Sequence, residues 1–113
     1  SNQPDIARGF LNNSTLEMMT KSIFNDLKID DIFYCIHDDG ECQCRKPFPG
    51  LIFAAQKKWN IDLSKSIMIG DTEKDLGAAQ NAELKFYLID TNYNKNICYN
   101  YKIEKLMDIT KYI

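Results

Sequence analysis

The stretch Ser66-Ile-Met-Ile-Gly-Asp-Thr-Glu-Lys-Asp75 indicates the fold most directly. Its apolar centre, ending at Gly70, is typical of a strand buried on both faces of a parallel sheet. Asp71 follows at the carboxyl end of that strand, and Thr72 can cap a helix that starts immediately afterwards. One carboxylate at the strand end and a second at the helix start are suited to presenting oxygen ligands to Mg²⁺.

Outward from this stretch, predicted helices and strands alternate along the chain. Further buried strands are predicted at Asp31–Cys35 and Phe86–Ile89, and the Asn-rich segment Thr91–Asn100 is predicted to be a loop. The other helical segments are Ser14–Leu27, with Ser14 and Glu17 as a capping box, Pro49–Asn60, with a first-turn proline, and Ile103–Tyr112. This order predicts an α/β fold, a Rossmann-like parallel sheet flanked by helices, whose ligands bind beyond the carboxyl ends of the strands.

Residues 35–44 hold three of the four cysteines and the only histidine of the chain. The candidate metal ligands are Cys35, His37, Cys42 and Cys44. A Cys-x-His pair and a Cys-x-Cys pair suit tetrahedral Zn²⁺. Four protein ligands leave no position open on the metal for water or substrate. The sequence therefore predicts a structural zinc loop. Arg45 and Lys46 follow the loop directly, so the loop would determine where these two positively charged side chains lie.

Free thiols or a disulfide are the alternative to zinc. Cys42 and Cys44 are too close in sequence to bridge each other without strain, and Cys98 lies in an unrelated segment. The sequence contains no signal peptide, so a reducing, cytoplasmic setting is expected.

Composition narrows the class of protein. The 113 residues are 44% hydrophobic and carry a net charge of −2, which fits one small domain. The sequence has no stripe of basic residues that would indicate a nucleic-acid partner. It also has no apolar run long enough for a membrane span.

Three motifs in order along the chain carry a resemblance to a known family. They are Ser-Asn-Gln-Pro-Asp-Ile-Ala-Arg-Gly at residues 1–9, Cys-x-His with Cys-x-Cys-Arg-Lys-Pro-x-Pro-Gly at residues 35–50, and Gly-Asp-x-x-x-Asp at residues 70–75. Together they resemble the haloacid dehalogenase superfamily of aspartate-dependent phosphatases, in its zinc-loop branch. That branch contains the D-glycero-D-manno-heptose 1,7-bisphosphate phosphatases and the histidinol-phosphate phosphatases. The segment Asn2-Gln3 followed by Ile-Ala-Arg-Gly is more similar to the heptose enzymes, although these commonly have a lysine where this chain has Thr72.

The resemblance implies roles for six further residues and two cofactors. Ser1 would hydrogen-bond the transferring phosphoryl group, Lys46 would offset its charge, and Asp71 would bind Mg²⁺. The substrate, a phosphorylated sugar, would be contacted by Asn2 and Arg45. Asp75 would support the loop rather than touch the metal. Zn²⁺ and Mg²⁺ are the implied cofactors.

One element of the family is absent from these residues. The phosphatases attack phosphorus with an aspartate from an Asp-x-Asp motif, and residues 1–113 contain none. The chain is therefore expected to be the carboxyl-terminal part of a phosphatase, a single partial domain of residues 1–113, without the N-terminal strands and inactive by itself. The missing segment, or a second copy, is expected to complete the sheet. A non-catalytic, zinc-stabilised binding module is the alternative of another class.

Overall fold

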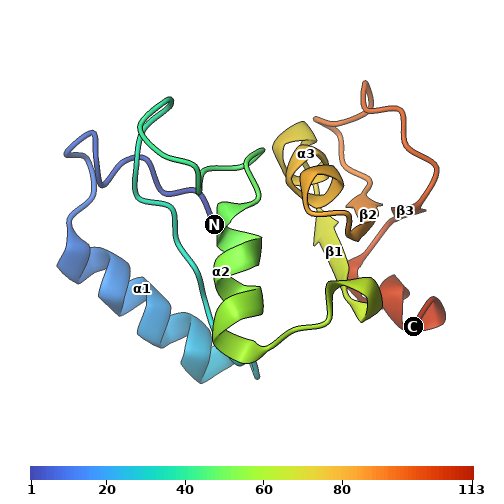
Figure 1. Cartoon of the computed structure of the whole chain (residues 1–113), viewed down its shortest axis with the longest axis horizontal. Coiled ribbons are helices and arrows are strands. Elements are labelled where there is room, and N and C mark those ends of the chain that lie inside the picture. The colour runs from blue at the N-terminus through green and yellow to red at the C-terminus, as the bar shows by residue number, and fades with distance from the viewer. The chain divides into compact units, whose positions relative to one another are not determined.

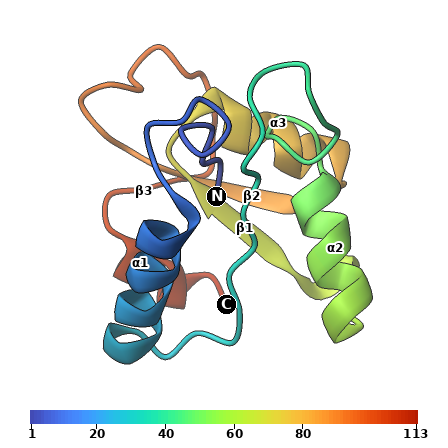
Figure 2. The same ribbon diagram turned by 90° about the vertical axis from the view of Figure 1, so that its left-hand side faces the viewer.

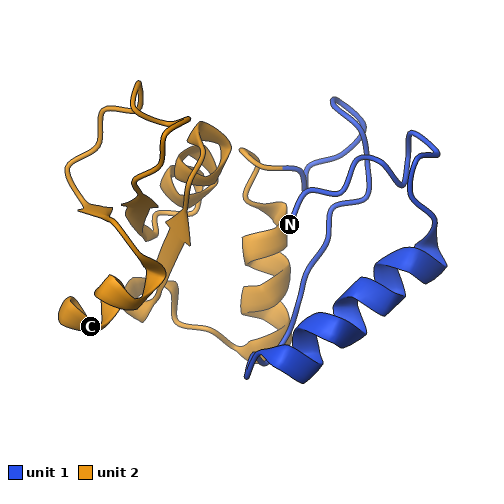
Figure 3. Ribbon diagram, turned by 180° about the vertical axis from the view of Figure 1, so that it is seen from behind, with its two compact units in different colours: residues 1–45 blue, residues 46–113 orange.

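The computed structural model describes residues 1–113, which form two compact units, residues 1–45 and residues 46–113 (Figure 3). None of the helices is both long and apolar enough to cross a lipid bilayer. That residues 1–113 belong to one partial phosphatase domain stays a prediction.

The first unit contains one helix, α1 (Asn13–Asp26). The predicted capping box at Ser14 and Glu17 is wrong, because the side chain of Asn12 caps the helix and accepts a hydrogen bond from the Thr15 amide at 2.8 Å. Asparagine caps at least as well as serine, and here it lies at the position that has the extended backbone of a cap. The hydroxyl of Ser14 donates to the same Asn12 oxygen at 2.8 Å.

The predicted strand Asp31–Cys35 is reduced to a single parallel bridge between Cys35 and Asn2. The Cys35 amide donates to the carbonyl of Ser1 at 2.9 Å, and the Gln3 amide donates to the carbonyl of Cys35 at 2.6 Å. The pairing stops there because the chain turns at Pro4, and the carbonyl of Gln3 accepts from the Ile6 amide at 3.3 Å within this turn instead of continuing the ladder. A regular strand was expected, but the paired segment is too short for one.

The second unit contains a three-stranded parallel sheet of order β1 (Ile67–Gly70), β2 (Lys85–Ile89) and β3 (Lys102–Ile103) (Figure 1). The helix α3 (Glu73–Asn81) connects β1 to β2, as parallel neighbours require. This arrangement confirms the predicted α/β fold with a parallel sheet and flanking helices.

Apolar side chains pack on both faces of the sheet, but β1, which was predicted to be buried, is only half-buried along its whole length because it lies at the edge of the sheet. Phe86 and Leu88 of β2 pack with Ala79 of α3 on one face. Tyr87 packs with Ile109 on the other face. Alternate residues of a strand point to opposite faces, so one five-residue strand contributes to both clusters.

The elements outside the sheet differ in part from the predictions. The helix α2 (Gly50–Trp59) agrees with its predicted range except that Pro49 is the cap, and Asn60 ends it with a left-handed backbone, φ +52°. A short 3₁₀ helix, η1 (Leu63–Lys65), precedes β1. The predicted terminal helix is wrong: Lys102 and Ile103 form β3, and only a 3₁₀ helix, η2 (Leu106–Lys111), follows. The start of this segment is a strand rather than a helix because it pairs with β2, and sequence periodicity does not reveal such a pairing.

Figure 2 shows the loop between β2 and β3, residues 90–101. This loop carries a buried asparagine, Asn94, that joins two strand ends. The Asn94 side chain donates to the carbonyl of Asp71 at 2.9 Å and to the carbonyl of Ile89 at 2.7 Å. Its oxygen accepts from the Thr91 amide at 2.9 Å. One side chain thus fixes the carboxyl ends of β1 and β2 relative to each other.

We expect Asn94→Asp to lower the free energy of unfolding by about 1–3 kcal/mol, because two carbonyl oxygens would lose their donors and face a carboxylate instead. Urea denaturation measures this change. Asn92→Asp, the same substitution at an exposed position of the loop, is the control and should change the free energy by less than about 0.5 kcal/mol. Equal stability of the two variants would show that Asn94 does not join the strands.

Candidate functional site

The carboxyl end of β1 is organised around the buried side chain of Asp75. Its Oδ2 accepts hydrogen bonds from the Thr72 hydroxyl at 2.7 Å, the Thr72 amide at 3.1 Å and the Asp71 amide at 3.2 Å. Thr72 in turn caps α3, as predicted, by accepting from the Asp75 amide. The turn that presents Asp71 is therefore held by one carboxylate oxygen.

The other oxygen of Asp75 accepts from the ammonium group of Lys46, and the two form an ion pair. Burial raises the pKa of Asp75, but the hydrogen bonds from Lys46 and Thr72 outweigh burial and leave the pKa below its usual value. Asp75 is thus an anion at neutral pH, and its charge is matched by the lysine. A half-buried lysine is held at the end of β1, beside the turn that carries Asp71.

Two glycines make this arrangement sterically possible. A Cβ atom added at Gly70 would lie 2.4 Å from the Cβ of Asp75, so a larger residue in this part of β1 would displace the carboxylate. A Cβ atom added at Gly77 would lie 2.7 Å from the Cβ of Pro47. The same segment is fixed by Asn81, whose side-chain amide donates to the Pro47 carbonyl at 2.9 Å. Close approach of α3 to Pro47 therefore positions the preceding residue, Lys46.

Asp71 is half-buried at the strand end, and its carboxylate accepts a hydrogen bond from the hydroxyl of Tyr93 at Oδ2. This hydrogen bond raises the pKa of Tyr93 above its ordinary value, so the phenol keeps its proton at neutral pH. Asp71, Lys74 and Tyr93 are among the residues that line a cavity of about 420 Å³. A carboxylate that faces such a cavity can bind a cation or a polar ligand.

A second candidate site lies in the first unit, where the predicted zinc ligands meet. One ligand atom from each of the residues Cys35, His37, Cys42 and Cys44 lies within 4.8 Å of all the others. The Cys42 sulfur is 3.3 Å from that of Cys35 and 3.2 Å from that of Cys44, and His37 Nδ1 is 3.4 Å from the Cys44 sulfur. These separations are comparable with the edge of about 3.8 Å expected between sulfur ligands of tetrahedral zinc. The donor set fits Zn²⁺.

Without a cation, the clustered thiols do not ionise equally. Burial, together with hydrogen bonds to Cys35 and Cys42, raises the pKa of Cys44 to about 12. Burial also acts to raise the pKa of Cys42, but hydrogen bonds from the two other thiols lower it to about 7. Only one of these two groups is then readily a thiolate, because adjacent negative charges repel each other. A divalent cation removes this conflict, since it binds thiolates in preference to thiols.

Two ion pairs hold the polypeptide around this cluster. Arg8 contacts the carboxylate of Asp38 through two nitrogens, at 2.6 and 2.8 Å. The hydrogen bond from Arg8 keeps the pKa of Asp38 well below its usual range. Arg45, which is buried, lies 2.6 Å from the carboxylate of Asp39. Neither pair was predicted from the sequence.

The structure places the predicted site residues in two groups. Lys46, Asp71 and Asp75 come together in the second unit. In the first unit, Ser1 and Asn2 lie beside Cys35, and the Ser1 hydroxyl accepts from the side chain of Gln3 at 3.1 Å. The roles of these residues in binding and catalysis stay predictions.

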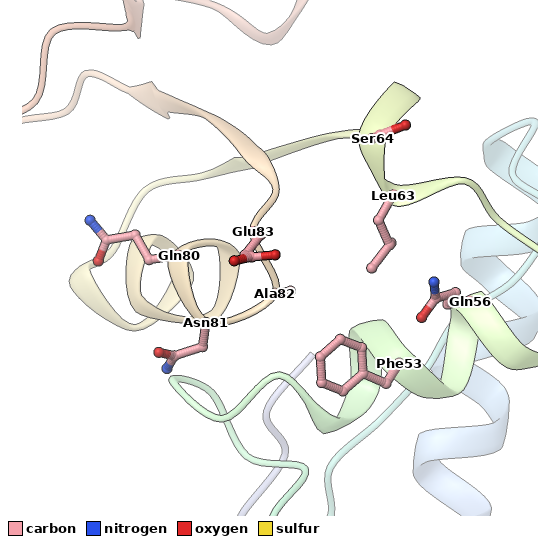
Figure 4. A pocket seen from close by; sticks show the side chains of 8 residues that line it. All are labelled: Phe53, Gln56, Leu63, Ser64, Gln80, Asn81, Ala82 and Glu83. Carbon is pink, nitrogen blue, oxygen red and sulfur yellow. The ribbon is translucent and has the colours of Figure 1, made fainter.

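A larger cavity of about 550 Å³ lies elsewhere in the second unit, between α2, η1 and the end of α3 (Figure 4). Phe53 and Gln56 of α2 lie on one side of it and Gln80 and Asn81 of α3 on the other. Glu83 is its only charged lining residue, and it holds no cysteine or histidine. Its lining offers a single carboxylate and no set of metal ligands, so it is a weaker candidate than the end of β1.

Comparison with known proteins identifies the family. The model of the HAD-hydrolase-like family matches residues 43–103, more than half of the chain. D-glycero-beta-D-manno-heptose-1,7-bisphosphate 7-phosphatase of Pasteurella multocida is 33% identical over the whole chain, which covers 71% of that protein. The chain belongs to the HAD-like hydrolase family, in the heptose-bisphosphate phosphatase group.

Other members of the group show the same similarity. D-glycero-alpha-D-manno-heptose-1,7-bisphosphate 7-phosphatase of Photorhabdus laumondii is 38% identical over 82% of the chain and 58% of that protein. D-glycero-beta-D-manno-heptose-1,7-bisphosphate 7-phosphatase of Helicobacter pylori is 41% identical over 79% of the chain and 56% of that protein. The chain spans little more than half the length of most of these curated relatives.

A solved structure of the same group also matches. The crystal structure of D,D-heptose 1.7-bisphosphate phosphatase from B. bronchiseptica, complexed with magnesium and phosphate, superposes with a TM-score of 0.85 at 27% identity. The match covers 98% of the chain and 69% of that protein. The HAD-like fold inferred from the motifs is therefore confirmed.

The sequence did not reveal two residues that contact Asp71 at the end of β1. Tyr93 and Asn94 lie in the segment interpreted only as an Asn-rich loop, yet both contact Asp71. An asparagine a few residues after a buried strand is a signal that could have been used, because such side chains often bind the backbone of their own turn.

We expect Cys42→Ser to lower both the zinc content and the thermal stability of protein purified without added zinc, because zinc affinity is partly folding free energy. Elemental analysis and thermal unfolding measure the two quantities. Cys98→Ser is the matched control, since Cys98 is exposed and outside the cluster. Full zinc retention by the Cys42 variant would contradict the ligand assignment.

Proposed function

We propose that the whole protein to which these residues belong is a Mg²⁺-dependent phosphatase of a phosphorylated sugar, with D-glycero-D-manno-heptose 1,7-bisphosphate as the preferred substrate. The proposal rests mainly on one observation. At the carboxyl end of β1, the carboxylate of Asp75 binds both the ammonium group of Lys46 and the backbone amide of Asp71. Membership in the HAD-like family and the names of the relatives support it.

In the proposed reaction, an aspartate outside residues 1–113 attacks phosphorus. The bond from phosphorus to the sugar oxygen breaks, its electron pair leaves with that oxygen, and a second aspartate supplies the proton. Water then hydrolyses the aspartyl phosphate. Lys46 offsets negative charge on the phosphoryl group, and the Ser1 hydroxyl donates a hydrogen bond to it.

Asp71 is the proposed ligand of Mg²⁺, which when bound neutralises charge on the phosphoryl oxygens. Its position at a strand end beside a cavity supports this role. Both carboxylate oxygens of Asp75 already accept hydrogen bonds, one from Lys46 and the other from the turn at Thr72. This favours a structural role for Asp75 over metal binding.

The proposed zinc site shapes the substrate-binding loop. Zn²⁺ held by Cys35, His37, Cys42 and Cys44 would fix the loop that ends at Arg45. Arg45 and Asn2 are proposed to contact the sugar or its second phosphate. The guanidinium group of Arg45 already pairs with one carboxylate, that of Asp39, which supports its proposed role in binding an acidic group.

We expect Asp71→Asn and Lys46→Ala each to reduce turnover of the heptose bisphosphate by about 100-fold or more in the whole protein, because both remove stabilisation of the transition state. Arg45→Ala should change substrate preference more than metal binding. Phosphate release from both anomers of the sugar and from histidinol phosphate measures these effects. The matched controls are Glu104→Gln and Lys57→Ala, at exposed positions that do not line the cavity beside Asp71.

Unchanged turnover in both the Asp71 and Lys46 variants would contradict the mechanism. Faster hydrolysis of histidinol phosphate would assign the protein to that activity instead. A whole protein that holds zinc but hydrolyses neither substrate would support a non-catalytic binding module.

We also propose that a further strand pairs with β1, supplied by a segment outside residues 1–113 or by a second copy. In the described sheet β1 is hydrogen-bonded to β2 only, and unpaired edges of apolar strands favour pairing. Native mass spectrometry of the 113-residue chain should therefore show a dimer or a companion peptide. A cooperatively unfolding monomer without a companion would contradict this placement.

A further inference from the structure

Tyr93 contacts the carboxylate of Asp71 although nothing in the apolar core requires it to be there. Its side chain is 68% exposed, and its hydroxyl donates to Asp71 Oδ2. An exposed tyrosine contributes little burial energy, so packing does not account for its position. The hydrogen bond to a charged acceptor is the main polar contact that the structure gives this side chain.

The backbone beside Tyr93 is fixed by its neighbour. Asn94 is 2% exposed and is bonded to the carbonyls of Asp71 and Ile89 and to the amide of Thr91. The backbone of Tyr93 is therefore held in a defined position next to Asp71, at the same strand end. A defined starting point reduces the conformational entropy lost when the phenol binds the carboxylate.

We propose that Tyr93 is a positioning residue that holds the Asp71 carboxylate in the orientation for binding a divalent cation. The proposal rests on the proposed function of Asp71. A carboxylate has two oxygens and about four acceptor sites, so a hydrogen bond at Oδ2 leaves acceptor capacity for a metal. Hydrogen bonds of this kind orient metal ligands, and their loss typically weakens metal binding 10- to 100-fold.

The neighbouring acid is held in another way. Asp75 is bound by a lysine, a hydroxyl and two backbone amides, whereas Asp71 receives a phenol at its carboxylate. A neutral donor leaves the negative charge of Asp71 unmatched, whereas Lys46 matches that of Asp75. Of the two carboxylates, Asp71 therefore keeps the stronger attraction for a cation.

The test is Tyr93→Phe in the whole protein with zinc bound, titrated with Mg²⁺ alone by isothermal titration calorimetry. The dissociation constant should rise about tenfold. The Mg²⁺ concentration for half-maximal turnover should rise by a similar factor, while turnover at saturating Mg²⁺ and the midpoint of thermal unfolding stay unchanged. Tyr101→Phe is the matched control, because Tyr101 is also exposed but packs against Tyr87 and Tyr99.

Two results would overturn the inference and leave the proposed function standing: unchanged or tighter Mg²⁺ binding by the Tyr93 variant, while Asp71→Asn abolishes binding. Tighter binding would mean that the phenol competes with the cation. If Asp71→Asn leaves the affinity for Mg²⁺ unchanged, both the inference and the metal-binding part of the proposed function are wrong.

Discussion

The buried negative charge of Asp75 is the constraint on which the arrangement at the end of β1 depends. A carboxylate in the interior is costly unless donors surround it, and this one collects a lysine, a hydroxyl and two backbone amides. Each donor is itself fixed in the process. The turn after β1, the start of α3 and the segment before Pro47 are held by one side chain, and Asp71 is presented as a result.

The two units use different chemistry to order irregular backbone. In residues 1–45 little apolar surface is buried, and Leu16 and Cys35 are the hydrophobic residues that are buried there. The thiol and imidazole cluster and two arginine ion pairs take the place of a core. In residues 46–113 two apolar clusters on the faces of a sheet provide the stability, and polar groups order only the strand ends.

The sequence predicted the parts of the structure that depend on local pattern. The apolar run before Asp71, the Thr72 cap and the metal-ligand spacing each need only a few adjacent residues, and the structure contains all three. One local prediction was wrong, since Asn12 rather than Ser14 caps α1. The other errors arose where distant segments decide the outcome. β3 forms because it pairs with β2. The bridge at Cys35 stays short because its partner segment turns at Pro4. The contacts of Asn94 and Tyr93 were missed for the same reason.

Thr72 shows how narrowly such a turn restricts evolutionary change. Its hydroxyl acts at once as donor to the Asp75 carboxylate and as acceptor from the Asp75 amide. Only a residue with a hydroxyl group on Cβ can do both from this position, so serine is the single conservative exchange. A lysine at this position would abolish both bonds, because its side chain has no oxygen to donate to the carboxylate or to accept from the amide. The turn that carries Asp71 therefore depends on a single hydroxyl group.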